Sequence, residues 1–293
     1  MTCRRVGPVS TSPLCCVHAL ENLVLSCLST RNICGLSMKH HPHVQHTIPV
    51  HTAHWTRQAA SKIQATPANR FPAFDVGKLR PLMPNHHVWD SWFVMTEDGQ
   101  VADIHGFRVL VALTRPLTAS SGEGEKIGYF YSKDGVHYHI GGMLLPQSLY
   151  ADAREWSGST ILRKDGRLQT FYTIATGVQI DGIWQTSQRF ATAIQSVSIE
   201  GDGAGQRLLL GEPTYHSLLA EPDGDYYETV QQASQREANY PSRHRLTSGD
   251  EQSENLCFRD PKFYRDAKTG KAYLLFEGNT GTHFCPVSPA LLI

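Results

Sequence analysis

Short segments rich in β-branched and aromatic residues alternate with Asp-Gly turns along most of this chain. Three such turns, at residues 97–99 (Glu-Asp-Gly), 133–135 (Lys-Asp-Gly) and 164–167 (Lys-Asp-Gly-Arg), separate segments with the length of β-strands. An Asp-Gly pair tolerates the positive φ angles that a tight hairpin requires. Turns at intervals of about 8 to 12 residues, with few amphipathic helical stretches, predict an all-β fold. Periodicity alone leaves a sandwich, a barrel and a propeller open.

The pattern predicts where the individual elements lie. Paired strands are expected at residues 92–96 and 107–114, 126–132 and 137–141, 159–163 and 168–176, 195–200 and 206–210, and 215–219 and 225–229. A short helix is expected at residues 56–64, with Thr56 as its cap, before a series of prolines interrupts regular structure. The polar segment 231–254 lacks periodicity and carries Pro241, so it is predicted to be a loop.

The charge balance points to a neutral substrate. The 27 Lys and Arg residues equal the 27 Asp and Glu residues, so the net charge of zero gives no reason to expect nucleic acid, a membrane surface or an acidic partner. No segment approaches the roughly 20 apolar residues of a membrane span. An apolar run at residues 20–28 follows Arg4 and Arg5 as in a signal peptide, but Glu21 and Asn22 interrupt it.

The first 51 residues differ in composition from the rest of the chain. They contain five of the seven cysteines, and histidines cluster at residues 40–43 (His-His-Pro-His). The spacing of these histidines from Cys27 and Cys34 matches no zinc pattern, so neither a metal site nor a disulfide framework is predicted. Residues 1–51 are therefore expected to form a tail of uncertain order, as readily an artefact of the translation start as a functional leader.

Two aspartates in apolar or aromatic surroundings are the first candidates for a shared site. Asp90 lies in residues 87–92 (His-Val-Trp-Asp-Ser-Trp), and Asp260 lies in residues 258–261 (Phe-Arg-Asp-Pro). A carboxylate among such neighbours is costly unless its charge is used or compensated. The alternative is that Asp90 caps a turn and Asp260 begins one, since Asp before Pro is common in turns.

Two further segments supply what a sugar site needs. Residues 155–159 (Glu-Trp-Ser-Gly-Ser) offer a flat ring beside hydroxyl groups, and residues 275–280 (Leu-Phe-Glu-Gly-Asn-Thr) form a strand pattern that ends in polar groups. Aromatic platforms with a few fixed polar groups suit a polyhydroxylated ligand, whose ring faces are apolar and whose rim is hydroxyl. For Trp156 the alternative is ordinary core packing.

In this order, the four segments resemble the levansucrase family, the sucrose-splitting fructosyltransferases of glycoside hydrolase family 68, and most closely its Gram-negative members. The resemblance runs from Trp55-Thr56-Arg57 to Thr280-Gly281. It implies a five-bladed β-propeller whose innermost strands surround a central site. It also implies a partial catalytic propeller at residues 52–281, followed by an atypical end at residues 282–293. The fold is expected to be incomplete, with the closing blades missing.

The resemblance also implies a role for each candidate residue. Asp90 is the expected nucleophile of a retaining mechanism that passes through a fructosyl-enzyme intermediate, and Asp260 is the expected transition-state stabiliser. The expected substrate-binding residues are Trp89, Trp92, Trp156, Ser157, Arg259 and Glu277. Sucrose and fructan acceptors are the expected partners, no cofactor or metal is expected, and the implied location is extracellular.

The acid/base glutamate is the one functional group that cannot be placed. In the family it follows the Glu-Gly-Asn-Thr segment by roughly one blade, whereas here only 16 residues follow Glu277. We therefore expect a truncated levansucrase-like chain of doubtful competence. The alternatives are a non-catalytic sugar-binding remnant or inactive gene fragment, and a β-fructofuranosidase-type hydrolase, whose relatives usually open with an Asn-Asp-Pro motif instead.

Overall fold

The computed structural model describes residues 57–70, 73, 75–120, 123–239, 257–279 and 290–293. The chain divides into two compact units, Met1–Phe74 and Asp75–Ile293. In the first unit, the described regular structure is the helix α2 (Arg57–Ser61), shorter than the helix predicted at residues 56–64. Thr56, the predicted cap, and both predicted domain boundaries, at residues 51 and 281, lie outside the described residues.

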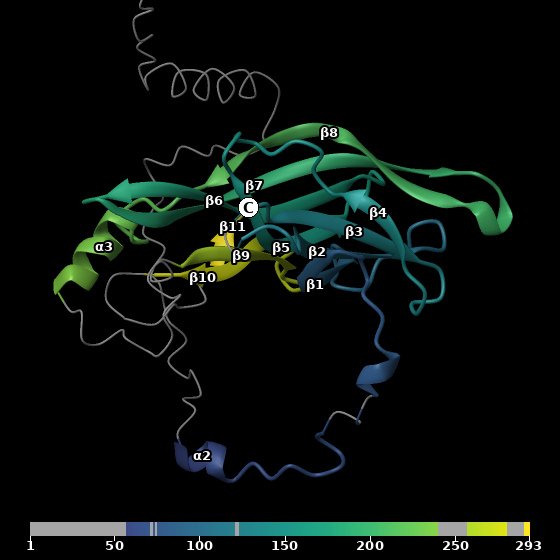
Figure 1. The fold of residues 1–293 in the computed structure, drawn as a ribbon, viewed down its shortest axis with the longest axis horizontal. Helices are drawn as coiled ribbons and strands as arrows, with labels where there is room; N and C mark the ends of the chain where they lie inside the picture. Colours follow the sequence, from purple (N-terminus) through teal and green to yellow (C-terminus); the bar gives the residue numbers. More distant parts are fainter. Residues whose placement is uncertain (1–56, 71–72, 74, 121–122, 240–256, 280–289) are drawn as a thin grey trace, which may run out of the picture. The chain divides into compact units, whose positions relative to one another are not determined.

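The second unit is built mainly from antiparallel β-strands (Figure 1). Its first four strands form a sheet that we call the first meander: β1 (His86–Thr96), β2 (Arg108–Pro116), β3 (Lys126–Ser132) and β4 (His139–Met143). The next four form the second meander: β5 (Arg154–Leu162), β6 (Leu168–Ile180), β7 (Ile183–Glu200) and β8 (Arg207–Ala220). A separate three-stranded sheet, which we call the third sheet, contains β9 (Phe258–Arg265), β10 (Ala272–Gly278) and β11 (Ala290–Leu292). The predicted all-β class is confirmed.

A parallel pair joins the two meanders into one eight-stranded sheet. The order is β4-β3-β2-β1-β5-β6-β7-β8, so the first strand of each meander lies at the junction. Val94 to Thr96 of β1 pair with Thr160 to Leu162 of β5 in parallel, whereas all other pairings in this sheet are antiparallel. The first strands of the two meanders, β1 and β5, therefore lie next to one another in the middle of the eight-stranded sheet.

The three Asp-Gly turns behave as predicted. At the turn between β5 and β6, Gly166 has a φ of +79°, in the left-handed region that glycine adopts without steric cost. The carboxylate of Asp165 accepts a hydrogen bond of 3.1 Å from the backbone N–H of Arg167, which closes the turn. The first three predicted strand pairs are confirmed, with ends that differ by a few residues.

Predictions for the last third of the chain are partly wrong. The expected strands at residues 206–210 and 215–219 are one long strand, β8, and residues 225–229 are not a strand. The helix α3 (Val230–Asn239) occupies the start of the expected loop. The Thr229 N–H donates to Oε1 of Gln232 at 2.9 Å, while the Thr229 hydroxyl accepts from the Gln232 N–H at 3.3 Å. This reciprocal capping box starts the helix, and its Thr-x-x-Gln spacing is a sequence signal that the loop prediction overlooked.

Short 3-10 turns and an aromatic cluster complete the unit. The turns are η1 (Val76–Lys78) and η2 (Gly203–Gly205). The cluster places Phe190 of β7 in a stack with Phe258 of β9, with ring centroids 4.2 Å apart, and edge-on to Phe276 of β10 at 4.9 Å. All three rings are buried, and each such pair contributes about 0.5 to 1.5 kcal/mol beyond its buried area. This cluster anchors the third sheet to the second meander.

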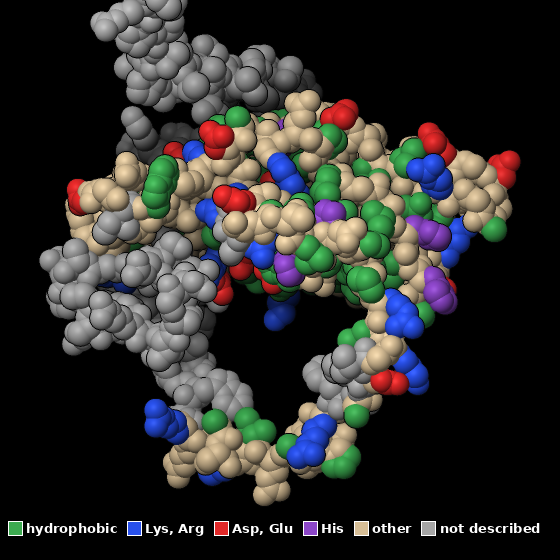
Figure 2. Space-filling view, in the orientation of Figure 1, with side chains coloured by type: hydrophobic (Ala, Val, Ile, Leu, Met, Phe, Trp, Pro, Cys, Tyr) green, Lys and Arg blue, Asp and Glu red, His purple; other side chains and the backbone are tan. Residues whose placement is uncertain are grey.

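The face seen in Figure 2 has no dominant charge. Acidic and basic side chains are interspersed on the face seen in Figure 2, in agreement with the net charge of zero. Among the described residues, no helix has the length and apolar character needed to span a membrane.

Candidate active site

All eight predicted site residues lie on strands of the second unit. Trp89, Asp90 and Trp92 belong to β1, Trp156 and Ser157 to β5, Arg259 and Asp260 to β9, and Glu277 to β10. Seven of them thus come from β1, β5 and β9, the first strands of the two meanders and of the third sheet. Segments separated by more than 160 residues in sequence are brought to one region by this arrangement.

Each of the three strands carries its key polar residue at a break in the pairing. In β1, Asp90 is an extra residue between two positions that pair consecutively with β2. In β5, Ser157 is the extra residue opposite β6. In β9, residues 260 and 261 lie opposite the single residue Phe276 of β10. A β-bulge changes the direction of a side chain relative to the normal alternation, so all three strands use the same device to present a polar group.

Both aspartates have left-handed backbone conformations. The φ angle is +34° at Asp90 and +59° at Asp260. Aspartate tolerates this region better than most residues, but the conformation still costs about 1 to 2 kcal/mol relative to an extended strand. The interpretation that Asp90 caps a turn and Asp260 begins one is wrong, because both residues lie within strands. Strained positions of this kind cluster at functional sites.

Asp90 and Ser157 are joined by a hydrogen bond. The Ser157 hydroxyl donates to Oδ2 of Asp90 at 2.8 Å, across the junction between β1 and β5. Ser157 is nearly buried, whereas Asp90 is exposed. A fixed donor on one oxygen holds the carboxylate in a defined rotation and leaves the exposed side chain accessible to a ligand.

Asp260 belongs to the same group of charges. Burial raises the pKa of its carboxyl, the Arg259 guanidinium opposes this rise in pKa, and the nearby carboxylates of Glu277 and Asp90 reinforce it. The Ser157 hydroxyl lowers the pKa of Asp260 and so favours its ionised form. The two aspartates predicted to share a site therefore interact electrostatically.

Arg259 connects Asp260 to Glu277. Its Nε donates to Oε2 of Glu277 at 3.0 Å and lies 4.0 Å from Oδ2 of Asp260. Arg259 and Glu277 are also directly opposite partners in the β9–β10 ladder. Because the guanidinium is planar and always charged, this pairing fixes a positive group beside the partly buried Asp260.

The three tryptophans have different surroundings. The Trp92 indole N–H donates to Oγ1 of Thr160 on β5 at 3.1 Å, and the Trp92 ring packs against the main core. Trp89 lies beneath the guanidinium of Arg115 at 5.8 Å, and Trp156 beneath that of Arg154 at 5.1 Å. All three rings are partly exposed. Their roles as walls of a sugar pocket remain predictions.

Glu155, the neighbour of Trp156, is occupied by structural contacts. Its side chain is 1% exposed and accepts hydrogen bonds from Nζ of Lys126 at 3.1 Å, the Ile127 N–H at 3.2 Å and the Ser148 hydroxyl at 2.7 Å. With both oxygens engaged by donors, this carboxylate ties β5 to β3 and is not a candidate proton donor.

Sequence reasoning missed Thr173 of β6. Its hydroxyl oxygen accepts a 2.9 Å hydrogen bond from the Asp260 N–H and donates a 3.3 Å hydrogen bond to the Ser157 carbonyl. Thr173 is fully buried in the middle of an ordinary strand pattern, so the sequence carries no local signal of this contact.

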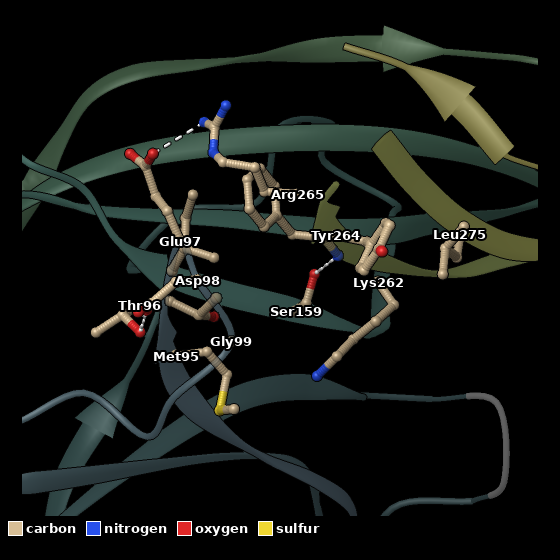
Figure 3. Close-up of a pocket in the computed structure, with 13 residues that line it drawn as sticks. Met95, Thr96, Glu97, Asp98, Gly99, Ser159, Lys262, Tyr264, Arg265 and Leu275 are labelled. Carbon is tan, nitrogen blue, oxygen red and sulfur yellow. Dashed lines mark hydrogen bonds and ion pairs between the residues drawn. The ribbon is translucent and has the colours of Figure 1, made fainter. Parts of the chain in front are cut away.

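A cavity of about 340 Å³ lies toward the other ends of the same three strands (Figure 3). It is lined by residues 95–99, 159–161, 262–265 and 275, and neither aspartate reaches it. Several of its polar groups already pair with one another: Arg265 contacts Glu97 at 2.8 Å, and Ser159 accepts from the Phe263 N–H (Figure 3). The candidate site is therefore the group of residues around Ser157, not this cavity.

Comparison with known proteins identifies the family of this chain. The model of glycoside hydrolase family 68, described as levansucrase/invertase, matches residues 46–286. The chain belongs to this family. A family 68 relative, the levansucrase of Bacillus amyloliquefaciens, is 31% identical over 248 residues, covering 78% of this chain and 48% of the relative.

Solved structures of family 68 proteins have the same fold. An inulosucrase from Halalkalicoccus jeotgali, bound to kestose, superposes with a TM-score of 0.57 and 33% identity, over 76% of this chain and 50% of that chain. Bacillus subtilis levansucrase superposes with a TM-score of 0.56 and 28% identity, over 73% and 47% of the two chains. The predicted five-bladed β-propeller family fold is confirmed, and the chain spans about half the length of these relatives.

Proposed function

We propose that this chain carries a sucrose-acting, levansucrase-like transferase site, and that the residues described above are the part of it that binds and reacts with the fructosyl unit. The observation that supports this most directly is the placement of both aspartates around Ser157, whose hydroxyl donates to Asp90 and whose carbonyl is linked through Thr173 to the Asp260 N–H. A retaining transfer needs a carboxylate that can reach the anomeric carbon and a surrounding charge distribution that favours an oxocarbenium-like transition state. Two carboxylates beside one sugar ring provide both.

In this proposal Asp90 is the nucleophile. Its exposed carboxylate attacks C2 of the fructosyl unit, the bond from C2 to the glucosyl oxygen breaks, and a fructosyl ester forms on Asp90. The departing oxygen takes a proton from a general acid. An acceptor hydroxyl then attacks C2, its proton passes to the conjugate base of that acid, and the Asp90 carboxylate is released.

Asp260 stabilises the transition state without forming a bond. Its carboxylate lies close to positive charge that develops on the ring, and it can accept hydrogen bonds from fructose hydroxyls. Arg259 favours the ionised form of Asp260 despite burial, and Glu277 holds Arg259 in place. Trp89, Trp92 and Trp156 are proposed to bound the sugar pocket.

The relatives also support the proposed substrate class. A levansucrase that is 27% identical to this chain has been solved in complex with sucrose, and the Halalkalicoccus inulosucrase was solved with kestose. We extend sucrose as donor and fructan oligosaccharides as acceptors to this chain as part of the proposal.

The general acid is not assigned to any of the site residues. Glu277 is engaged by Arg259, and Glu155 is buried among structural donors. Protonation of the leaving group is worth roughly 10²- to 10⁴-fold in rate. A donor whose leaving group needs no proton, such as β-fructofuranosyl fluoride, therefore tests the nucleophile independently of the general acid.

The test uses the full chain with fructosyl fluoride and with sucrose. We expect fluoride release and a covalent adduct, one fructosyl unit in mass, on the peptide that contains Asp90. Asp90→Asn should abolish both, whereas Asp98→Asn, which alters a carboxylate in the turn after β1, should leave both unchanged. Absence of adduct and fluoride release from a folded chain would reject the proposal.

A second candidate is sugar binding without turnover. One relative, 29% identical over 78% of this chain, is named an inactive levansucrase from Geobacillus stearothermophilus. Calorimetric titration with sucrose separates the two functions, since the binding protein would take up sucrose with heat exchange yet release no fluoride from fructosyl fluoride. Steady release of both glucose and fructose from sucrose, without transfer to an acceptor, would instead indicate a β-fructofuranosidase-type hydrolase.

A further inference from the structure

The strand β9 is held on the second meander by side chains in place of a β-ladder. The Phe258 N–H donates to Oε1 of Gln188 at 3.0 Å, the Asp260 N–H to Oγ1 of Thr173 at 2.9 Å, and the Phe263 N–H to Oγ of Ser159 at 2.9 Å. The Ser159 hydroxyl in turn donates to the Pro261 carbonyl at 2.7 Å.

The three side chains that receive β9 come from three adjacent strands. Gln188 lies on β7, Thr173 on β6 and Ser159 on β5, and their exposed fractions are 1%, 0% and 2%. Polar side chains buried to this extent are costly unless they are hydrogen-bonded, so the interface between the sheets specifies where β9 must lie. Their order shows that β9 crosses the second meander from β7 towards β5.

Thr173 is the member of this set that contacts both halves of the candidate site. Its Oγ1 accepts from the Asp260 N–H and donates to the Ser157 carbonyl at 3.3 Å. Ser157 and Asp260 are both at bulges, where backbone groups lose their ladder partners. A hydroxyl both donates and accepts, so a single atom serves the two bulges at once.

We propose that Thr173 is a positioning residue that sets the distance between the carboxylates of Asp90 and Asp260. It fixes the backbone of Ser157, whose hydroxyl holds Asp90, and it fixes the backbone of Asp260. The effect of Thr173 on the reaction rate rests on the proposed function, whereas its effect on the distance between the two carboxylates does not.

The first experiment measures the coupling between the two carboxylates and requires no turnover. Because the Asp90 charge raises the pKa of Asp260, Asp90→Asn should lower the pKa of Asp260 in the wild-type background, as followed by NMR titration of carbon-13-labelled aspartate. In a Thr173→Val background, Asp90→Asn should lower the pKa of Asp260 by half as much as in the wild-type background, or less. Thr173→Ser retains the hydroxyl and should restore the full decrease. An undiminished coupling in folded T173V would overturn the proposal.

A control distinguishes positioning from general stability. Ser159→Ala removes another buried hydroxyl that holds β9, at a point beyond Asp260. It should lower the unfolding midpoint in urea but retain the greater part of the coupling. Equal loss of coupling in S159A and T173V would assign the effect to loosening of β9 as a whole and would overturn the specific role of Thr173.

The wild-type chain provides a measurement for the case in which T173V does not fold. A hydrogen bond from the Asp260 N–H to a fully buried hydroxyl requires slow amide hydrogen exchange. Exchange at Asp260 as fast as at the exposed turn residue Lys164 would overturn the proposal without any variant.

The kinetic test links positioning to the proposed function. With fructosyl fluoride as donor, T173V should reduce the rate of adduct formation on Asp90 by roughly 10- to 100-fold with little change in the donor concentration at half-saturation, and T173S should recover most of the rate. If T173V weakens the coupling but neither the wild type nor any variant reacts with the donor, the proposed function fails and the positioning role stands. If the wild type reacts and T173V reacts equally well, the positioning role fails alone.

Discussion

The Ser157 hydroxyl donates a hydrogen bond of 2.8 Å to Oδ2 of Asp90, between two residues that are each the extra residue of a β-bulge. The bond crosses the only parallel pairing in the eight-stranded sheet, the junction of β1 and β5. Ser157 therefore transmits the position of the second meander directly to the carboxylate on the first. The predictions below follow from this contact and from the bulges that make it possible.

Ser157→Ala should impair fructosyl transfer far more than stability. Without its donor, the Asp90 carboxylate rotates freely, and misplacement of a reacting group by about 1 Å costs on the order of 10²-fold in rate. The loss of one hydrogen bond to a charged group destabilises the fold by about 1.5 to 3 kcal/mol at most. The rate of adduct formation with fructosyl fluoride and the urea unfolding curve measure the two effects. The matched control is Ser148→Ala, which removes a similar serine donor from the structural carboxylate Glu155 and should leave the rate unchanged.

The stability of the chain should show a pH dependence that belongs to Asp260. Since burial raises its pKa in the folded state above the ordinary value of 3.8, the folded chain retains this proton at a pH at which the unfolded chain has lost it. The stabilising contribution is therefore fully present below pH 3.8 and is lost as the pH rises through the folded pKa. Urea unfolding of the wild type and of Asp260→Asn across this range should show that the free energy of unfolding of the wild type falls relative to that of the variant as the pH rises.

Arg259→Met should raise the pH at which the stabilising contribution of Asp260 is lost. The guanidinium lowers the pKa of Asp260, so its removal should raise that pKa further and extend the loss of stability to higher pH. Arg259→Lys keeps the charge but not the planar fork and should give an intermediate pKa. An NMR titration in which the Asp260 pKa of R259M equals or falls below that of the wild type would contradict this account.

Asp260→Ala should be less stable than Asp260→Asn by about 1 kcal/mol, because the φ of +59° is disfavoured for alanine and tolerated by asparagine. The control is Asp181, an exposed residue in the β6–β7 turn with a φ of +50°. The same Ala and Asn pair at Asp181 should differ by a similar amount. Equal unfolding midpoints for the two Asp260 variants would show that the left-handed conformation is not maintained in solution.

Gly158→Ala should disrupt the bulge that carries Ser157. A Cβ at residue 158 would lie 1.9 Å from the Phe171 carbonyl oxygen and 2.8 Å from Cα of Tyr172, both backbone atoms of β6. Overpacking of this kind costs about 1 to 3 kcal/mol or more, and here the strands themselves must separate. Gly166→Ala is the control, because that turn has a positive φ but open space around it. G158A should lose adduct formation with fructosyl fluoride, whereas G166A should lose only about 1 kcal/mol of stability.

Local sequence patterns determined much of the fold. The Asp-Gly turns and the β-branched and aromatic segments beside them predicted the strand pairs β1–β2, β3–β4 and β5–β6, because hairpins are specified by neighbouring residues. The capping box at Thr229 and Gln232 was equally local, and it was overlooked in favour of the polar composition of residues 231–254. The identity of the site residues also came from short motifs, and the family match agrees with the fold that these motifs imply.

The tertiary structure alone decided how those residues are placed. A bulge is a mismatch between two strands, so its position at Asp90, Ser157 or Asp260 depends on the partner strand and cannot be read from either segment. The contact of Thr173 with Ser157 and Asp260 joins residues up to 87 positions apart, and nothing near Thr173 in sequence encodes it. The chain thus specifies its strands and its chemical groups locally, while the packing of one sheet across another determines which of those groups meet.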